Sequence, residues 1–161
     1  PSAPEIPRYQ EDSALDIVEE GMKTALVCIS EPSRAEVVEQ AVSQMGYYVV
    51  SAGQAALAMR KLRHNRYDVV VLDECYGGAK ASDNLVLHHI QFLPMHVRRE
   101  FFLCLLSETM TTLDAMAAFR KCVDMIVNIQ DLDKFKIALS RAMKEHSVFY
   151  GIFRDELNKK G

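Results

Sequence analysis

The sequence lacks the features that mark several large classes of protein. It has no excess of positive charge, with 19 Lys and Arg against 22 Asp and Glu and a net charge of −3. This balance argues against nucleic acid as a main partner, because phosphate binding needs clustered cations. No apolar run reaches about 18 residues, so we expect no membrane-spanning segment. An apolar fraction of 49% and a charged fraction of 25% are typical of an ordinary globular domain.

The cysteines lack the close spacings of metal sites and redox motifs. There are four of them: Cys28, Cys75, Cys104 and Cys122. Two lie inside apolar runs, where a free cysteine behaves as a small hydrophobic residue. We therefore expect free thiols, no metal and a reducing, cytoplasmic environment. The only paired glycines, Gly77-Gly78, do not belong to a nucleotide-binding glycine pattern.

Residues 1–22 are expected to form a linker or an N-terminal extension. Three prolines among the first seven residues are typical of a linker. Because the chain starts at Pro1 and not at Met, we expect a fragment or a processed form of a longer protein. The acidic stretch 13–20 contains Leu15, Ile17 and Val18, and is compatible with a helical turn or an added edge strand.

From residue 23 onward, short apolar runs alternate with segments of helical spacing. The runs predict strands buried on both faces, at 25–29, 47–50, 68–73, 101–106 and 125–127. The intervening segments predict five helices, which begin near Pro32, Gly53, Asp83, Thr111 or Thr112, and Asp131. This alternation predicts a doubly wound α/β fold with a five-stranded parallel sheet, for which 2-1-3-4-5 is a common order.

Two of these helices carry explicit predictions about which side chains face the core. In the second helix the inward residues are expected to be Ala55, Ala56, Met59 and Leu62. In the fourth they are expected to be Leu113, Met116, Ala117 and Phe119. A basic cluster at the end of the second helix is expected to satisfy carbonyl groups and the helix dipole. Its members are Arg60, Lys61, Arg63, His64 and Arg66.

Three stretches lie where the first strand ends, where the second helix begins and along the third strand: Glu31-Pro32-Ser33-Arg34, Gly53-Gln54-Ala55-Ala56-Leu57 and Asp68-Val69-Val70-Val71-Leu72-Asp73. They resemble the receiver domains of bacterial two-component response regulators, the CheY-like family. The resemblance covers roughly residues 24–145 and implies the flavodoxin-like strand order. It also implies that Asp73 matches the phosphate-accepting aspartate, and that Ser107 matches the Ser or Thr that ends the fourth strand.

Other positions of the family's phosphorylation site are replaced. The two carboxylates that hold Mg²⁺ match Ile29 and Ser30, and the Lys that ends the fifth strand matches Asn128. The aromatic switch residue matches Met125. Phosphoryl transfer depends almost wholly on electrostatic stabilisation, which these replacements remove. The resemblance therefore implies a degenerate pseudo-receiver without enzymatic activity or cofactor, which signals by binding proteins.

Several alternatives remain open at this point. An atypical phosphoaccepting receiver of a phosphorelay would use Asp73 and Ser107, with Glu31 or Glu74 helping to hold Mg²⁺. A small-molecule sensor would use the emptied pocket above the sheet. Asp73 could also simply cap the loop that follows it, and Ser107 could cap the fourth helix.

The last helix is predicted to continue from about 131 to 158, past the end of a receiver domain. We therefore divide the chain into an extension at 1–22, a receiver-like domain at 23–147 and a helical extension at 148–161. The final turns carry Phe149, Phe153 and Leu157 at core spacing. Exposed apolar patches usually mark contacts, so we expect a homodimer or docking to the rest of a longer chain. Alternatively, residues 15–18 cover this patch.

Overall fold

The five apolar runs form one parallel sheet in the computed structural model. The structure describes residues 21–78 and 80–160, and for residues 81 and 149–160 it describes only the backbone. The strands are β1 (Thr24–Cys28), β2 (Tyr48–Ser51), β3 (Val69–Asp73), β4 (Phe102–Ser107) and β5 (Met125–Asn128). Their order is β2-β1-β3-β4-β5, which confirms the predicted topology.

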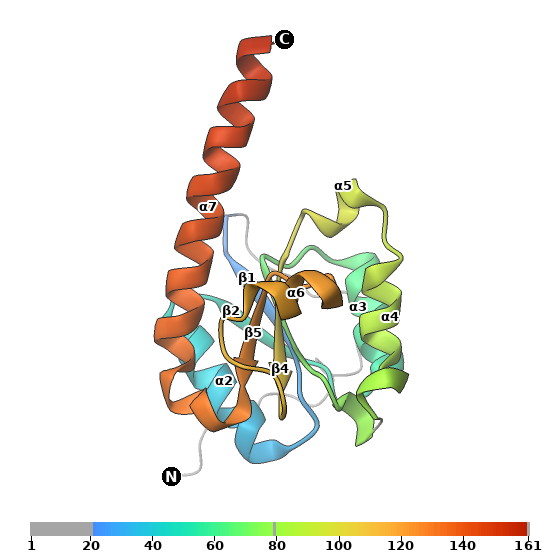
Figure 1. Ribbon diagram of the computed structural model, residues 1–161. Coiled ribbons are helices and arrows are strands. Elements are labelled where there is room, and N and C mark those ends of the chain that lie inside the picture. The colour runs from blue at the N-terminus through green and yellow to red at the C-terminus, as the bar shows by residue number, and fades with distance from the viewer. Residues whose placement is uncertain (1–20, 79, 161) are drawn as a thin grey trace.

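Helices cover both faces of this sheet (Figure 1). They are α2 (Pro32–Gln44), α3 (Ala55–His64), α4 (Leu85–Gln91), α5 (Met95–Arg98), α6 (Ala115–Lys121) and α7 (Phe135–Lys160). Short 3₁₀ turns lie at Tyr76–Gly78, Ala81–Asp83 and Ile129–Lys134. Within the described part of the chain, no helix is both long enough and apolar enough to cross a bilayer.

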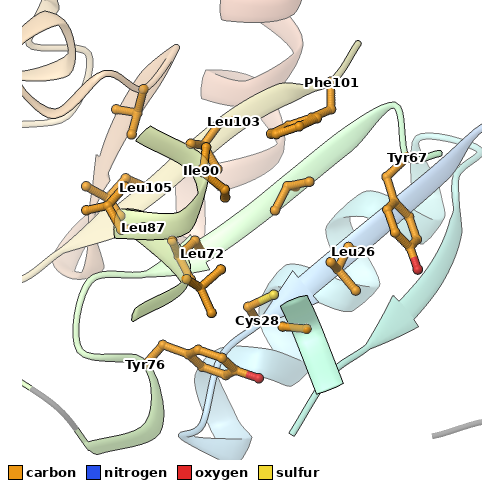
Figure 2. Packing of buried hydrophobic residues seen from close by; sticks show 14 of the residues in the cluster. Leu26, Cys28, Tyr67, Leu72, Tyr76, Leu87, Ile90, Phe101, Leu103 and Leu105 are labelled. Atoms are coloured by element: carbon orange, nitrogen blue, oxygen red, sulfur yellow. The ribbon is translucent and has the colours of Figure 1, made fainter. Parts of the chain in front are cut away.

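The core has two layers because successive strand residues point to opposite faces. One layer joins residues such as Leu26, Leu72 and Leu105 to α3 and α4, and includes Tyr67 and Tyr76 at its rim (Figure 2). The other joins the alternate strand residues to α2 and α7. β1, β3 and β4 are buried along their whole length, as expected for central parallel strands.

The outer edge of β5 is engaged by the segment just before α6. Leu113 N donates a hydrogen bond of 2.9 Å to the carbonyl oxygen of Ile126, and Asn128 N donates one of 2.9 Å to Thr112 Oγ1. Leu113 has a φ of 62°, in the left-handed region that a leucine rarely adopts. This unusual conformation turns the chain so that its amide meets the strand.

The predicted inner face of the fourth helix is right for Ala117 and wrong for Leu113, Met116 and Phe119. α6 begins at Ala115, two or three residues later than expected, and Asp114 caps it by accepting a hydrogen bond from Ala117 N at 3.0 Å. This start turns Ala117 and Ala118 inward. Met116 and Phe119 are 61% and 79% exposed. The error arose because Thr111, Thr112 and Asp114 are all good caps.

The other helices differ from their predictions in smaller ways. In α3 the buried residues are Leu57, Ala58 and Lys61, whereas Ala56 is exposed. Lys61 was assigned to the basic cluster at the end of this helix, and it differs from Arg60, Arg63 and His64 in being fully buried. The segment after α4 forms the additional short helix α5, which the spacing did not predict. α7 begins at Phe135 after a 3₁₀ turn, and it extends past the end of the sheet (Figure 1).

Candidate functional site

The carboxyl ends of the central strands bring the predicted site residues to one edge of the sheet. Asp73 ends β3 and is paired with Leu106 in the register of β4, and Ser107 is paired with Asn128. The end of β1 places Ile29 and Ser30 at the same edge. The structure therefore brings these predicted residues together at one edge, and their contacts decide what they can do.

Asp73 has both of its carboxylate oxygens engaged. The residue as a whole is 4% exposed. Oδ1 accepts a hydrogen bond of 3.0 Å from Cys75 N, so the predicted cap of the following loop is present. Oδ2 accepts a longer one of 3.4 Å from Arg34 Nη1. The aspartate is held by the loop on one side and by a cation on the other.

Arg34, in the first turn of α2, lies among three carboxylates. Its guanidinium nitrogens approach Asp73 Oδ2 at 3.4 Å, Glu108 Oε1 at 3.5 Å and Glu31 Oε2 at 3.9 Å. A guanidinium presents five N–H donors in a planar fork and stays charged at all relevant pH values. Sequence reasoning missed this role, since Arg34 was noted only as part of a matching stretch.

The residues at the end of β1 do not fit a Mg²⁺ ion. Ile29 is 7% exposed and belongs to the apolar core. Ser30 Oγ accepts a hydrogen bond of 2.8 Å from Gly77 N. In the part of the chain that the structure describes, no group of three or more His, Cys, Asp or Glu could hold a metal ion. Mg²⁺ needs an octahedral set of oxygen ligands, which these residues do not supply.

Glu31, which the sequence analysis considered as an alternative Mg²⁺ ligand, serves as the N-cap of α2. It accepts hydrogen bonds from Ser33 N at 3.2 Å and Arg34 N at 2.9 Å. The hydrogen bonds from the Ser33 hydroxyl and from these amides hold the pKa of the Glu31 carboxyl below its usual value. This cap fixes the turn that carries the Arg34 side chain toward β3.

Ser107 and Asn128 stabilise the loops that follow their strands. Ser107 Oγ accepts hydrogen bonds from Thr109 N at 3.2 Å and Met110 N at 3.0 Å. Ser107 thus caps a turn. The alternative in which it caps the fourth helix is wrong, because Asp114 caps α6. Asn128 Oδ1 accepts from Gln130 N at 2.9 Å, and Nδ2 donates to the carbonyl of Met110 at 2.8 Å. Both ends of this amide are occupied within the fold.

A further residue at this edge, Asn84, was not predicted. It is 1% exposed, and its Nδ2 donates 2.9 Å hydrogen bonds to the carbonyls of Asp73 and Glu74. Its Oδ1 caps α4 by accepting from Leu87 N at 3.0 Å. One buried amide therefore ties the end of β3 to the start of α4, and Glu74 is buried beside it.

The remaining predicted residues lie apart from this network. Burial, followed by the nearby carboxylates of Glu108, Asp73 and Glu74, raises the pKa of the Cys75 thiol, which disfavours a reactive thiolate. Met125, the match to the aromatic switch residue, is 2% exposed in the core. The side chains of Phe149, Phe153 and Leu157 lie outside the described residues.

Known proteins match this chain in structure and not in sequence. No family model matches the sequence, and no curated protein matches it. Among solved structures, the receiver domain of a Francisella response regulator aligns with a TM-score of 0.59 at 16% identity, covering 77% of this chain and 98% of its own. The chain has the receiver-domain fold.

Two further neighbours share this fold. The response regulator TrrA of Thermotoga maritima, solved in complex with Mg²⁺ and beryllofluoride, has a TM-score of 0.56 and 21% identity, with 75% of this chain and 99% of TrrA covered. A putative pilus assembly-related protein of Burkholderia pseudomallei has a TM-score of 0.55 and 22% identity, with 80% and 94% covered. At these identities the likeness concerns the fold alone.

Proposed function

We propose that this chain is a receiver-like signalling module of a bacterial cytoplasmic protein that acts through protein contacts and carries out no phosphoryl transfer. The observation that supports this proposal is the position of Arg34. Its guanidinium lies 3.4 Å from the carboxylate that matches the phosphate acceptor, and it also contacts Glu108. The protein's own cation therefore partly offsets the charge of this carboxylate, although Arg34 is shared with Glu31 and Glu108.

The cation also disfavours a metal at this place. A divalent ion that bound beside Asp73 would have to displace Arg34 or tolerate its positive charge at close range. The oxygen of Ser30 and both ends of the Asn128 amide already have partners within the protein. An incoming phosphoryl group would therefore find few unoccupied hydrogen-bond donors here. Arg34 is the one cation among these residues that could contact such a group.

The partner is proposed to be a protein, either a separate chain, a second copy or the rest of a longer chain. The support is α7, which is helical to Lys160. Beyond His146, whose ring packs edge-on against Phe102 at 5.1 Å, the sequence continues the apolar spacing with Phe149, Phe153 and Leu157. Replacing Phe153 and Leu157 by Asp in the full chain should abolish any self-association seen by light scattering.

The decisive test is an amide NMR titration of the full chain with Mg²⁺ and beryllofluoride. We expect no saturable shifts at the amides of Asp73, Ser107 and Asn128 at millimolar Mg²⁺. TrrA, whose solved structure holds both ligands, serves as the positive control. Saturable shifts that disappear in Asp73→Asn would instead support the alternative, an atypical phosphoaccepting receiver that uses Asp73.

A further inference from the structure

α3 and α4 lie on the opposite side of the domain from α7 (Figure 1). A groove runs between these two helices. It consists of two adjoining hollows of about 230 Å³ and about 360 Å³, which share Arg63 and His89. The larger hollow lies over the middle of α3. The smaller one lies at the amino end of the sheet, between the end of α3, α5 and the start of β4.

The groove combines an apolar floor with a basic rim. Partly buried apolar side chains line it from α3 and from the α4–α5 region: Met59, Leu62, Leu93 and Val97. Three exposed arginines stand along its border: Arg60, Arg63 and Arg66. One carboxylate, Glu100, approaches Arg66 at 3.8 Å, and this exposed pair contributes little to stability. The surface therefore suits a ligand that is both apolar and acidic.

His89 provides a second indication of a ligand. Its Nε2 atom is buried and has no hydrogen-bond partner among the described residues. An unsatisfied buried polar atom is costly, and most such atoms in folded proteins are paired. His89 lines both hollows, so a segment bound in the groove would contact this residue.

The chain contains a segment of matching chemistry just before β1. Residues 11–20 carry five carboxylates and no basic residue. Among these acidic residues stand Leu15, Ile17 and Val18. The carboxylates complement the arginine rim, and the three apolar side chains complement the floor of the groove.

The start of β1 lies close enough to the groove for the preceding segment to reach it. Thr24 Oγ1 donates a hydrogen bond of 3.0 Å to the carbonyl of Arg66, and Thr24 N donates one of 2.8 Å to Asp68 Oδ2. Residue 20 is four positions from Thr24, and therefore at most about 14 Å from it. Ten further residues span up to about 35 Å when extended, which is enough to follow the groove along α3.

We propose that residues 11–20 dock in the α3–α4 groove of the same chain, with carboxylates on the arginine rim and apolar side chains on the floor. This docking differs from the alternative in which residues 15–18 cover the end of α7. It does not depend on whether Asp73 accepts phosphate. A docked segment of this kind occupies a surface that an acidic, amphipathic partner would otherwise bind.

The test is a charge exchange within the full chain, read by amide NMR and hydrogen exchange. One variant reverses the rim (Arg60→Glu with Arg63→Glu), a second reverses the segment (Asp16→Lys with Glu19→Lys), and a third combines all four changes. We expect each double variant to shift amides in both 15–20 and 59–66, and to reduce exchange protection of 15–18 at least fivefold. The combined variant should recover most of that protection, because the charges again complement each other.

A matched control reverses two exposed acidic residues elsewhere, with Glu36→Lys and Asp133→Lys, and should leave 15–20 and 59–66 unchanged. The proposal is overturned if the segment variant leaves 59–66 and 89–97 unmoved. It is equally overturned if the shifts fall in 143–148, which would place the segment on α7. Shifts that grow with concentration between 50 μM and 1 mM would assign the groove to a second copy and also reject docking within the chain.

Discussion

The carboxyl edge of the sheet and the α3–α4 groove differ in how far their polar groups are satisfied. At the carboxyl edge, Asp73, Ser107 and Asn128 are each engaged by neighbours of the same chain. In the groove, three arginines line the border and the Nε2 atom of His89 has no hydrogen-bond partner among the described residues. The position that resembles a phosphorylation site is thus internally paired, whereas an unrelated position has the character of a binding surface.

This difference separates polar groups that hold the fold together from polar groups that are available at the surface. Paired polar groups at the carboxyl edge contribute to stability, so removing them should unfold or loosen the domain. Groups at the groove contribute little to stability and should affect binding. Four predictions test this contrast, from the largest expected effect to the smallest.

Asn84→Ala should lower the free energy of unfolding by about 3 kcal/mol, since it leaves buried carbonyls of Asp73 and Glu74 without a donor and removes the cap of α4. Asn84→Asp should retain the cap but bury a carboxylate oxygen against two carbonyl oxygens, so its loss of stability should be at least as large. Urea denaturation measures both. Arg63→Ala in the groove is the contrast and should change stability by less than about 0.5 kcal/mol. A loss below about 1 kcal/mol for Asn84→Ala would contradict its role.

Arg34→Ala should destabilise the domain by about 1 kcal/mol, because Asp73 then lies buried near Glu108 without its cation. The effect is smaller than for a fully buried pair, since the side chains of Arg34 and Glu108 are 25% and 52% exposed. Urea denaturation with and without 0.5 M NaCl measures it, and salt should reduce the difference. An unchanged or increased stability would show that the cation is not needed there.

Cys75 should react with iodoacetamide at pH 7.5 several-fold more slowly than the exposed Cys122, because burial and nearby carboxylates raise its thiol pKa. Arg34 lowers that pKa, so Arg34→Ala should slow Cys75 further. Cys28, whose pKa burial raises to about 12, should react only after unfolding. Peptide mass spectrometry over time follows each thiol. Rapid labelling of Cys75 would mean that the carboxyl edge is more open than its contacts indicate.

Glu31→Gln should lower stability slightly at neutral pH and not at all in strong acid. The folded pKa of Glu31 lies below its usual value near 4.5, so the ionised group stabilises the fold above that value. This contribution disappears as the pH falls through the lowered pKa. The difference in melting temperature between the wild-type protein and Glu31→Gln should therefore shrink as the pH is lowered from 7 to 3. A difference that persists at pH 3 would have another origin.

The sheet was largely predictable from sequence because buried parallel strands are short, apolar and separated by helical segments. The same logic placed Asp73, Ser107 and Asn128 at one edge, since the carboxyl ends of parallel strands meet there. Ser107 and Asn128, which end β4 and β5, are paired directly across these two strands.

What could not be predicted depends on side-chain direction and on contacts between distant residues. Arg34 meets a carboxylate 39 positions away, and no local pattern encodes that contact. Asn84 has the local signature of a helix cap, but its two carbonyl contacts exist only once β3 and α4 pack together. The inner face of α6 was misjudged because a shift of two or three residues in the start of a short helix rotates its apolar stripe.

The hydrogen bonds on the outer edge of β5 affect whether another chain can add a strand there. An open edge strand presents unpaired N–H and C=O groups on which another chain can add a strand, and this is a common route to fibrous aggregates. Here the segment 111–114 takes hydrogen bonds at Ile126 and Asn128. Strand addition at this edge would first require that segment to peel away and Leu113 to relax from its left-handed conformation. Strand addition at this edge is therefore disfavoured, and a partner that meets this side would make its contacts mainly through side chains.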